Sequence, residues 1–177
     1  MKTDLTKISK KMSYALRHRP DAVGITLDAN GWVGVTELLA ALRIDRATLD
    51  AVVEGNDKQR FAIDGDRIRA SQGHSVPVDL QLVAAEPPAA LFHGTGSENL
   101  DSIRRDGLRK GRRHHVHLSA DTATAFAVGR RRQPAEVAIL RIDAAAMRAS
   151  GYTFFRSANG VWLTDAVPPV FITDGVA

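Results

Sequence analysis

Arginine and histidine gather in several short segments of this chain. The segments are residues 16–20 (LRHRP), 68–75 (IRASQGHS), 93–95 (HGT), 113–119 (RHHVHLS) and 128–131 (VGRR). Arginine binds phosphate through paired hydrogen bonds and keeps its charge, and histidine exchanges protons near neutral pH. The chain contains no cysteine, which excludes a thiolate nucleophile, a disulfide framework and a cysteine-ligated zinc site. His115 and His117 share one face of a predicted strand, but without a third ligand they make a weak metal site, so no metal is expected.

Each of these residues also has a purely structural explanation when it is taken alone. Arg17 and His18 fall at the C-terminal end of a predicted helix, where the helix dipole favours a cation. Arg69 could be a surface charge on a hairpin, and His93 could be a hydrogen-bonded histidine of the core. The chemistry therefore depends on whether the segments act together.

The elements that must position these residues belong to an ordinary globular chain. Its 177 residues are 44% hydrophobic and 25% charged, which excludes a disordered or collagen-like protein and favours one or two domains. No apolar run approaches the roughly 20 residues that cross a bilayer. The N-terminal residues lack the apolar stretch of a signal peptide, so a cytoplasmic protein is expected.

The net charge of +4 comes entirely from the second half of the chain. Residues 1–90 hold 12 basic and 12 acidic residues, whereas residues 91–177 hold 12 basic and 8 acidic residues. Basic residues cluster over residues 2–19 and 104–132, a pattern that favours a polyanionic partner. Solvated faces that aid solubility are the alternative explanation for either cluster alone.

The first half predicts short helices followed by a β-hairpin. Apolar residues at 8, 12, 15 and 16 predict a helix over residues 6–18. Thr36 and Asp45 are expected to cap helices that run to Leu42 and Gly55. The Asp64-Gly65 pair between alternating arms at 60–63 and 67–70 predicts a hairpin, with Phe61, Ile63, Ile68 and Ala70 facing inward and Arg67 and Arg69 outward. This order is typical of a winged helix, so residues 1–76 are predicted to form a winged-helix-like lobe.

The second half, after a connection rich in proline and alanine, predicts a lobe of mixed strands and helices over residues 77–177. Strands are expected at 90–92, 116–118, 137–142, 152–155, 161–164 and 170–172, and helices at 97–106, 121–128 and 144–149. Asn159-Gly160 predicts a hairpin turn. His93, Gly94 and Thr95 are expected at the end of the first strand, just before a helix capped by Ser97. The fold class is therefore α+β.

The segments taken together, in this order and with residues 157–164 (SANGVWLT), resemble the NAD-dependent RNA 2′-phosphotransferases, also called tRNA 2′-phosphotransferases. The resemblance runs from about residue 8 to residue 172, and motifs in a shared order are far more specific than any one of them. It implies a C-terminal lobe of the ADP-ribosyltransferase type and an N-terminal lobe that binds RNA.

The resemblance also implies a catalytic set. An Arg-His pair, an arginine in the segment IRASQGHS and an arginine after Val128-Gly129 fall on Arg17, His18, Arg69 and Arg131. Three arginines are consecutive at 130–132, and Arg132 and Gln133 stand where the family commonly has histidine and glycine, so the neighbouring arginines could share the role of Arg131.

NAD, as a consumed co-substrate, would bind the C-terminal lobe. The resemblance implies that His93 holds the adenosine ribose, that Gly94 lets nicotinamide approach the backbone, and that Thr95 belongs to the same strand. Gly107 and Leu108 correspond to the loop beside the adenine, and His117 and Ser119 to the second NAD-facing strand. Arg113 and His115 are implied to contact the pyrophosphate or the RNA. No glycine-rich Rossmann fingerprint is present.

The implied reaction has two steps. The RNA 2′-phosphate attacks C1″ of NAD and releases nicotinamide, and the ribose 2″-OH then attacks phosphorus to give 2′-OH RNA and ADP-ribose 1″,2″-cyclic phosphate. Residues 91–177 contain only the glutamates Glu98 and Glu136, which fits a phosphate nucleophile that needs no general base.

The alternatives are an ADP-ribosyltransferase that stops after the first step on a nucleic-acid terminal phosphate, and a non-catalytic RNA-binding module. We expect a monomer with RNA and NAD as partners and no membrane association.

Overall fold

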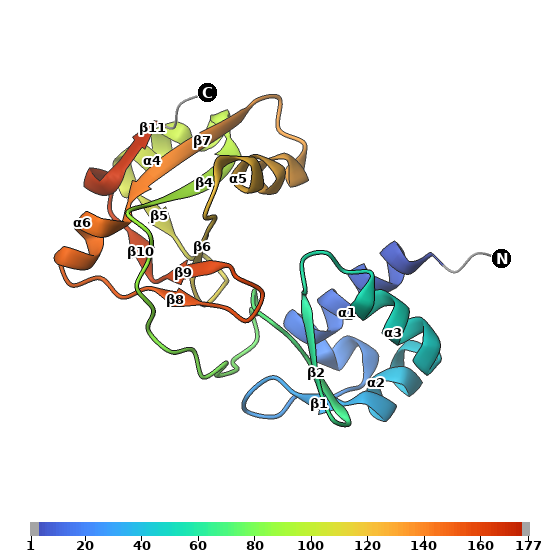
Figure 1. The fold of residues 1–177 in the computed structure, drawn as a ribbon. Helices are drawn as coiled ribbons and strands as arrows, with labels where there is room; N and C mark the ends of the chain where they lie inside the picture. Colours follow the sequence, from blue (N-terminus) through green and yellow to red (C-terminus); the bar gives the residue numbers. More distant parts are fainter. Residues whose placement is uncertain (1–3, 175–177) are drawn as a thin grey trace. The chain divides into compact units, whose positions relative to one another are not determined.

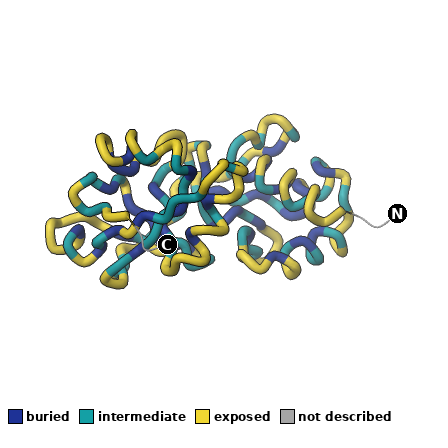
Figure 2. The backbone as a smooth tube through the Cα atoms, turned by 90° about the horizontal axis from the view of Figure 1, so that it is seen from above, coloured by how far each residue is buried: buried dark blue, intermediate teal, exposed yellow. Residues whose placement is uncertain are grey.

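The computed structural model describes residues 4–174 of the chain. The chain divides between Gln81 and Leu82 into two compact units (Figure 1). Each unit has its own buried core (Figure 2). Both units contain helices and small antiparallel sheets, as expected for an α+β protein. None of the helices within residues 4–174 combines the length and apolar character needed to span a bilayer.

The first unit consists of helices packed against a three-stranded sheet of order β1-β3-β2. Its elements are α1 (Leu5–Arg17), the 3₁₀ turn η1 (Pro20–Val23), β1 (Val33–Gly34), α2 (Val35–Leu42), α3 (Arg46–Glu54), β2 (Phe61–Asp64) and β3 (Arg67–Ala70). The predicted inward face of α1 is confirmed, because Met12, Ala15 and Leu16 are fully buried. The hairpin is confirmed as well, with Phe61 paired to Ala70 and Ile63 to Ile68.

The predicted start of α2 is wrong. The helix begins at Val35 after Gly34, and the side chain of Thr36 does not cap it. The Val35 amide donates instead to the carbonyl oxygen of Asp66, at 2.7 Å. The hairpin thus supplies a hydrogen-bond acceptor for an amide at the start of the helix, a role that a capping side chain often has. The cap at Asp45 is confirmed, because its carboxylate accepts a hydrogen bond from the Thr48 amide at 2.8 Å.

The second unit carries its strands in small sheets, of orders β11-β7-β4, β6-β9-β8 and β10-β5. Its strands are β4 (Ala90–Gly96), β5 (Leu108–Arg109), β6 (Val116–Leu118), β7 (Val137–Asp143), β8 (Phe155–Arg156), β9 (Trp162–Thr164), β10 (Ala166–Val167) and β11 (Ile172–Asp174). Its helices are α4 (Leu100–Asp106), α5 (Thr122–Gly129) and α6 (Ala144–Ala149), with 3₁₀ turns η2 (Ser97–Asn99), η3 (Arg130–Arg132) and η4 (Pro169–Phe171).

The strand that carries the HGT segment is longer than predicted. β4 pairs with β7 from Ala90 opposite Asp143 to Gly96 opposite Val137. His93, Gly94 and Thr95 therefore lie within the strand rather than at its end. Gly94 and Gly96 do not interrupt the strand, because every residue of β4 pairs with a residue of β7.

Helix α5 covers the face of this sheet to which Gly94 belongs (Figure 1). A Cβ added at Gly94 would collide with the carbonyl of Ala125 and come within 3.2 Å of the Gly129 amide. Because residues alternate along a strand, His93 and Thr95 belong to the opposite face. Gly94 thus permits close packing of helix on sheet.

Smaller boundary predictions also need correction. Ser97 makes no side-chain cap, because its amide donates to Glu136 and a 3₁₀ turn intervenes before α4 begins at Leu100. The last strand begins at Ile172 rather than residue 170, because Pro168 and Pro169 lead into η4. The strand expected at 152–155 is β8, at Phe155–Arg156, and its antiparallel pairing with β9 confirms the hairpin around Asn159-Gly160.

Candidate functional site

Arg17 and His18 lie at the C-terminal end of α1, where a later segment of the chain returns to them. The amide of Ser75 donates to the Arg17 carbonyl at 2.8 Å, and the Ser75 Oγ is 2.9 Å from Nδ1 of His18. Gly73 lies against the Arg17 side chain, since an added Cβ there would be 3.7 Å from its guanidinium. The segment 71–76 therefore fixes the end of α1, and Ser75 sets the rotation of the imidazole.

Arg69 projects from β3 onto an aromatic ring. Its guanidinium carbon is 4.4 Å from the centroid of Trp32, and its Nη1 donates to the carbonyl oxygen of Asn30 at 3.1 Å. The guanidinium carbon of Arg67 is 5.0 Å from the centroid of the same ring. Arg67 also forms an ion pair with Asp64, at 2.9 Å. An arginine placed over the face of a tryptophan is attracted by the ring quadrupole, so Trp32 holds this guanidinium in place.

The turn that carries Trp32 is itself well bonded. The carboxylate of Asp28 accepts hydrogen bonds from the amides of Asn30 and Trp32 at 2.8 and 2.9 Å, and the Asp28 amide donates to the Trp32 carbonyl at 2.8 Å. These bonds fix both of the groups that contact Arg69. Sequence reasoning missed Trp32 and Asn30, because only the fold brings residues 30–32 to β3.

In the second unit, His93 and His117 lie side by side on neighbouring strands. The Nδ1 of His93 is 3.1 Å from the carbonyl oxygen of His117, and Nδ1 of His117 is 3.0 Å from Nη1 of Arg113. Burial lowers the pKa of His93, the hydrogen bond to His117 acts in the opposite direction, and the charge of Arg113 lowers the pKa further. His93 is therefore a neutral imidazole at physiological pH.

The guanidinium of Arg113 is partly buried and near a second positive charge. Burial of its guanidinium lowers its pKa, and the charge of Arg132 acts in the same direction. Arginine stays protonated despite such shifts. The Arg113 guanidinium beside His117 thus also experiences the positive charge of Arg132, and such a local excess of positive charge suits an anionic ligand.

Ser119 and His115 flank this cluster. The amide and carbonyl of Ser119 exchange hydrogen bonds of 2.8 Å with those of Phe92, which joins the end of β6 to β4. His115 lies 5.4 Å from the ring of Phe155. Burial lowers the pKa of His115, and the charge of Asp165 partly offsets this effect. The structure thus brings together His93, His117, Arg113 and Ser119.

Gly107 and Leu108 serve the packing around β5. Gly107 ends α4, and a Cβ added there would collide with the carbonyl of Val167. Leu108 is buried and pairs with Val167 across the two-stranded sheet. Thr95 accepts a hydrogen bond at Oγ1 from Asn99 at 3.1 Å.

The three consecutive arginines lie in η3 and are not equivalent. The guanidinium of Arg130 is 5.6 Å from the ring of Phe126, on α5, whereas the charge of Arg132 acts on Arg113. Arg131 lies between them, and the turn ends at Gln133 with a left-handed backbone (φ 52°). The two neighbours of Arg131 thus differ in their surroundings, since Arg130 lies near an aromatic ring and Arg132 near another cation.

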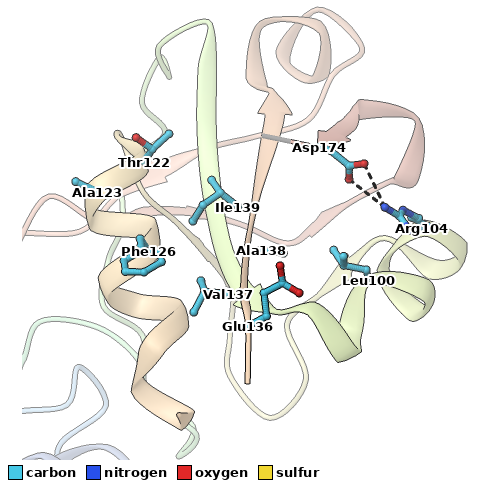
Figure 3. A pocket seen from close by; sticks show the side chains of 10 residues that line it. All are labelled: Leu100, Arg104, Thr122, Ala123, Phe126, Glu136, Val137, Ala138, Ile139 and Asp174. Atoms are coloured by element: carbon cyan, nitrogen blue, oxygen red, sulfur yellow. Dashed lines mark hydrogen bonds and ion pairs between the residues drawn. The ribbon is translucent and has the colours of Figure 1, made fainter. Parts of the chain in front are cut away.

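A groove of about 600 Å³ lies on the second unit, between α4, α5 and β7 (Figure 3). Its lining is largely apolar and includes Leu100, Phe126 and Ile139, with the ion pair of Arg104 and Asp174 at its rim. None of the site residues predicted from the sequence lines it. In residues 4–174, no group of three or more His, Asp or Glu side chains gathers in a way that could hold a metal ion.

Comparison with known proteins shows the family of proteins in which these arginines and histidines occur. The family model described as RNA 2′-phosphotransferase, Tpt1 / KptA family, matches residues 3–166. This chain belongs to the RNA 2′-phosphotransferase family. The family match covers every segment singled out above, from Arg17 to Arg131. The chain is therefore an enzyme.

Relatives named probable RNA 2′-phosphotransferase occur in several organisms. The chain is 55% identical over 172 residues to a probable RNA 2′-phosphotransferase of Rhizobium leguminosarum bv. trifolii, covering 95% of this chain and 93% of that protein. Probable RNA 2′-phosphotransferases of Streptomyces griseus and Nostoc punctiforme are each 53% identical, over 180 and 175 residues. The coverage is 94% of both chains for the first, and 95% of this chain and 96% of the relative for the second.

Proposed function

We propose that this enzyme removes an internal 2′-phosphate from RNA at the expense of NAD, by way of a 2′-phospho-ADP-ribosylated RNA. The products are 2′-OH RNA, nicotinamide and ADP-ribose 1″,2″-cyclic phosphate. The observation that carries the proposal is the match to the RNA 2′-phosphotransferase family along nearly the whole chain. The local settings of His18 and Arg69 support it, because Ser75 contacts the imidazole of His18, and Trp32 and Asn30 hold the guanidinium of Arg69.

In the first step, a 2′-phosphate oxygen forms a bond to C1″ of NAD while the bond from C1″ to nicotinamide breaks. A phosphate monoester is largely ionised at neutral pH, so the attacking oxygen needs no general base. A carboxylate beside it would repel it. The scarcity of glutamate in residues 91–177 supports this assignment.

In the second step, the ribose 2″-oxygen bonds to phosphorus and the bond from phosphorus to the RNA 2′-oxygen breaks. Negative charge builds on the phosphoryl oxygens, and Arg17, Arg69 and Arg131 are proposed to stabilise it through their fixed charges. His18 is proposed to carry the proton from the 2″-OH to the departing 2′-oxygen. The contact of its Nδ1 with Ser75 supports this role, because it fixes the ring's orientation.

The second unit is proposed to bind NAD as an ADP-ribosyltransferase-like lobe. A neutral His93 suits a ribose hydroxyl, because its Nδ1–H donates to the His117 carbonyl and Nε2 can then accept a hydrogen bond from the hydroxyl. The positive charges of Arg113 and Arg132, which influence one another, suit the pyrophosphate. The first unit, with its helices and hairpin, is proposed to act as a winged-helix-like RNA-binding lobe.

Incubation of the purified protein with NAD and a synthetic RNA that carries one internal 2′-phosphate tests the proposal. We expect nicotinamide and 2′-OH RNA in equal amounts, and nicotinamide release only when both substrates are present. Arg69→Ala is expected to lower kcat by about 10²–10³-fold, the usual cost of removing one charge-stabilising donor. A stable ADP-ribosylated RNA as the end product would favour the one-step alternative, and no nicotinamide release would favour a non-catalytic RNA-binding module.

A further inference from the structure

Helix α1 presents a polar stripe beside its buried face. Lys7, Lys11, Tyr14 and His18 recur at helical spacing and share one face. Of these four, Lys7, Lys11 and Tyr14 are exposed. The helix rises about 1.5 Å per residue, so the stripe extends over about 16 Å and ends at His18. It is long enough to follow a nucleic-acid strand for more than one nucleotide.

Tyr14 is the unusual member of this stripe. Its side chain is aromatic, and 50% of its surface is exposed. Its ring centroid lies 6.3 Å from that of His18, and its carbonyl accepts hydrogen bonds from the amides of both His18 and Arg19 at 3.0 Å. An exposed aromatic ring therefore lies directly beside the proposed phosphate-contacting histidine.

The charges along the stripe are available to a polyanion. Lys7 pairs with Asp4 at 3.5 Å, but the lysine side chain is 84% exposed, so water screens this pair strongly. Within residues 4–174, Lys11 has no carboxylate within ion-pair distance. Lysines on a common track with an exposed aromatic ring are the combination by which proteins hold single-stranded nucleic acid.

We propose that this stripe of α1 binds the RNA strand next to the 2′-phosphate, an inference that rests on the proposed function. Lys7 and Lys11 contact backbone phosphates, and the ring of Tyr14 stacks on the base adjacent to the phosphorylated nucleotide. This surface gives the enzyme affinity for RNA that does not depend on the 2′-phosphate or on NAD.

Binding of a short fluorescent single-stranded RNA, measured by anisotropy without NAD, tests the proposal. Tyr14→Ala is expected to weaken binding about tenfold and Tyr14→Phe to leave it unchanged, because stacking needs the ring and not the hydroxyl. The double variant Lys7→Gln/Lys11→Gln is expected to reduce the slope of log K against log salt concentration by about 1.4, or about 0.7 for each phosphate contact. Lys58→Gln is the matched control, an exposed lysine of the same unit outside the stripe.

An RNA with an abasic site next to the 2′-phosphate separates stacking from a general loss of structure. The wild-type protein is expected to bind this RNA as weakly as Tyr14→Ala binds the intact RNA, and Tyr14→Ala is expected to lose nothing further on it. Equal binding of intact RNA by Tyr14→Ala and wild type would overturn the proposal, while nicotinamide release by the same proteins would leave the proposed function standing. Absence of nicotinamide release by the wild type would reject the proposed function, whatever the binding result.

Discussion

Replacement of Trp32 by alanine tests whether the position of Arg69 matters for catalysis. The guanidinium of Arg69 is held by the Trp32 ring at 4.4 Å and by the Asn30 carbonyl at 3.1 Å. Trp32→Ala removes the first of these contacts and leaves the second. The side chain of Arg69 keeps its charge and then samples orientations that do not serve the phosphate.

The size of the effect follows from the strength of the lost contact. A cation over a tryptophan face contributes about 0.5–2 kcal/mol, and the upper part of this range applies because the ring and the guanidinium are both partly withdrawn from water. A loss of about 1–2 kcal/mol in the transition state lowers kcat/KM about 5- to 30-fold. Trp32→Phe keeps an aromatic face and is expected to recover most of this loss.

Steady-state release of nicotinamide with a 2′-phosphorylated RNA is the assay, with thermal unfolding as a check on the fold. Arg67→Ala is the control, because Arg67 contacts the same ring at 5.0 Å without a proposed role in catalysis, and it is expected to retain near-normal kcat/KM. The double variant Trp32→Ala/Arg69→Ala is expected to be no slower than Arg69→Ala. Wild-type kcat/KM in folded Trp32→Ala would show that the contact with Trp32 does not position Arg69 for catalysis.

Other perturbations test the second unit. Gly94→Ala is expected to lower the free energy of unfolding in urea by at least about 1–3 kcal/mol, because the new methyl group collides with the backbone of α5. Burial lowers the pKa of His93 below 6.5, so the unfolded chain binds a proton at this residue more readily than the folded chain does. The free energy of unfolding therefore falls as the pH drops below about 6.5. His93→Gln is expected to flatten this dependence in urea titrations between about pH 5 and 7. Arg130→Ala is expected to retain more activity than Arg131→Ala, because Arg130 lies against Phe126; equal losses in nicotinamide release would assign the role to the turn as a whole.

Local features of the sequence were sufficient to predict most elements of the fold. The apolar spacing along α1, the aspartate that caps α3 and the Asp64-Gly65 turn each act over a few residues, and each appears in the structure as expected. Local chemistry fails where a distant partner decides the outcome. The start of α2 is set by a bond from Val35 to Asp66, and the length of β4 is set by its pairing with β7.

The same distinction holds for the candidate site. The arginines and histidines could be identified from the residue types and the order of their motifs. Their supporting partners could not, because the contact of His18 with Ser75 spans 57 residues and that of Arg69 with Asn30 spans 39. Only the folded unit brings Trp32 to Arg69, and no spacing rule along the chain links the two residues.

The path of the phosphorus atom shows whether the RNA 2′-phosphate is transferred to ADP-ribose. An RNA labelled with ³²P at a single internal 2′-phosphate is incubated with the enzyme and NAD, and the labelled products are separated. We expect all of the released label in ADP-ribose 1″,2″-cyclic phosphate, and no release of label without NAD. Release of the label as inorganic phosphate, with or without NAD, would rule out this transfer.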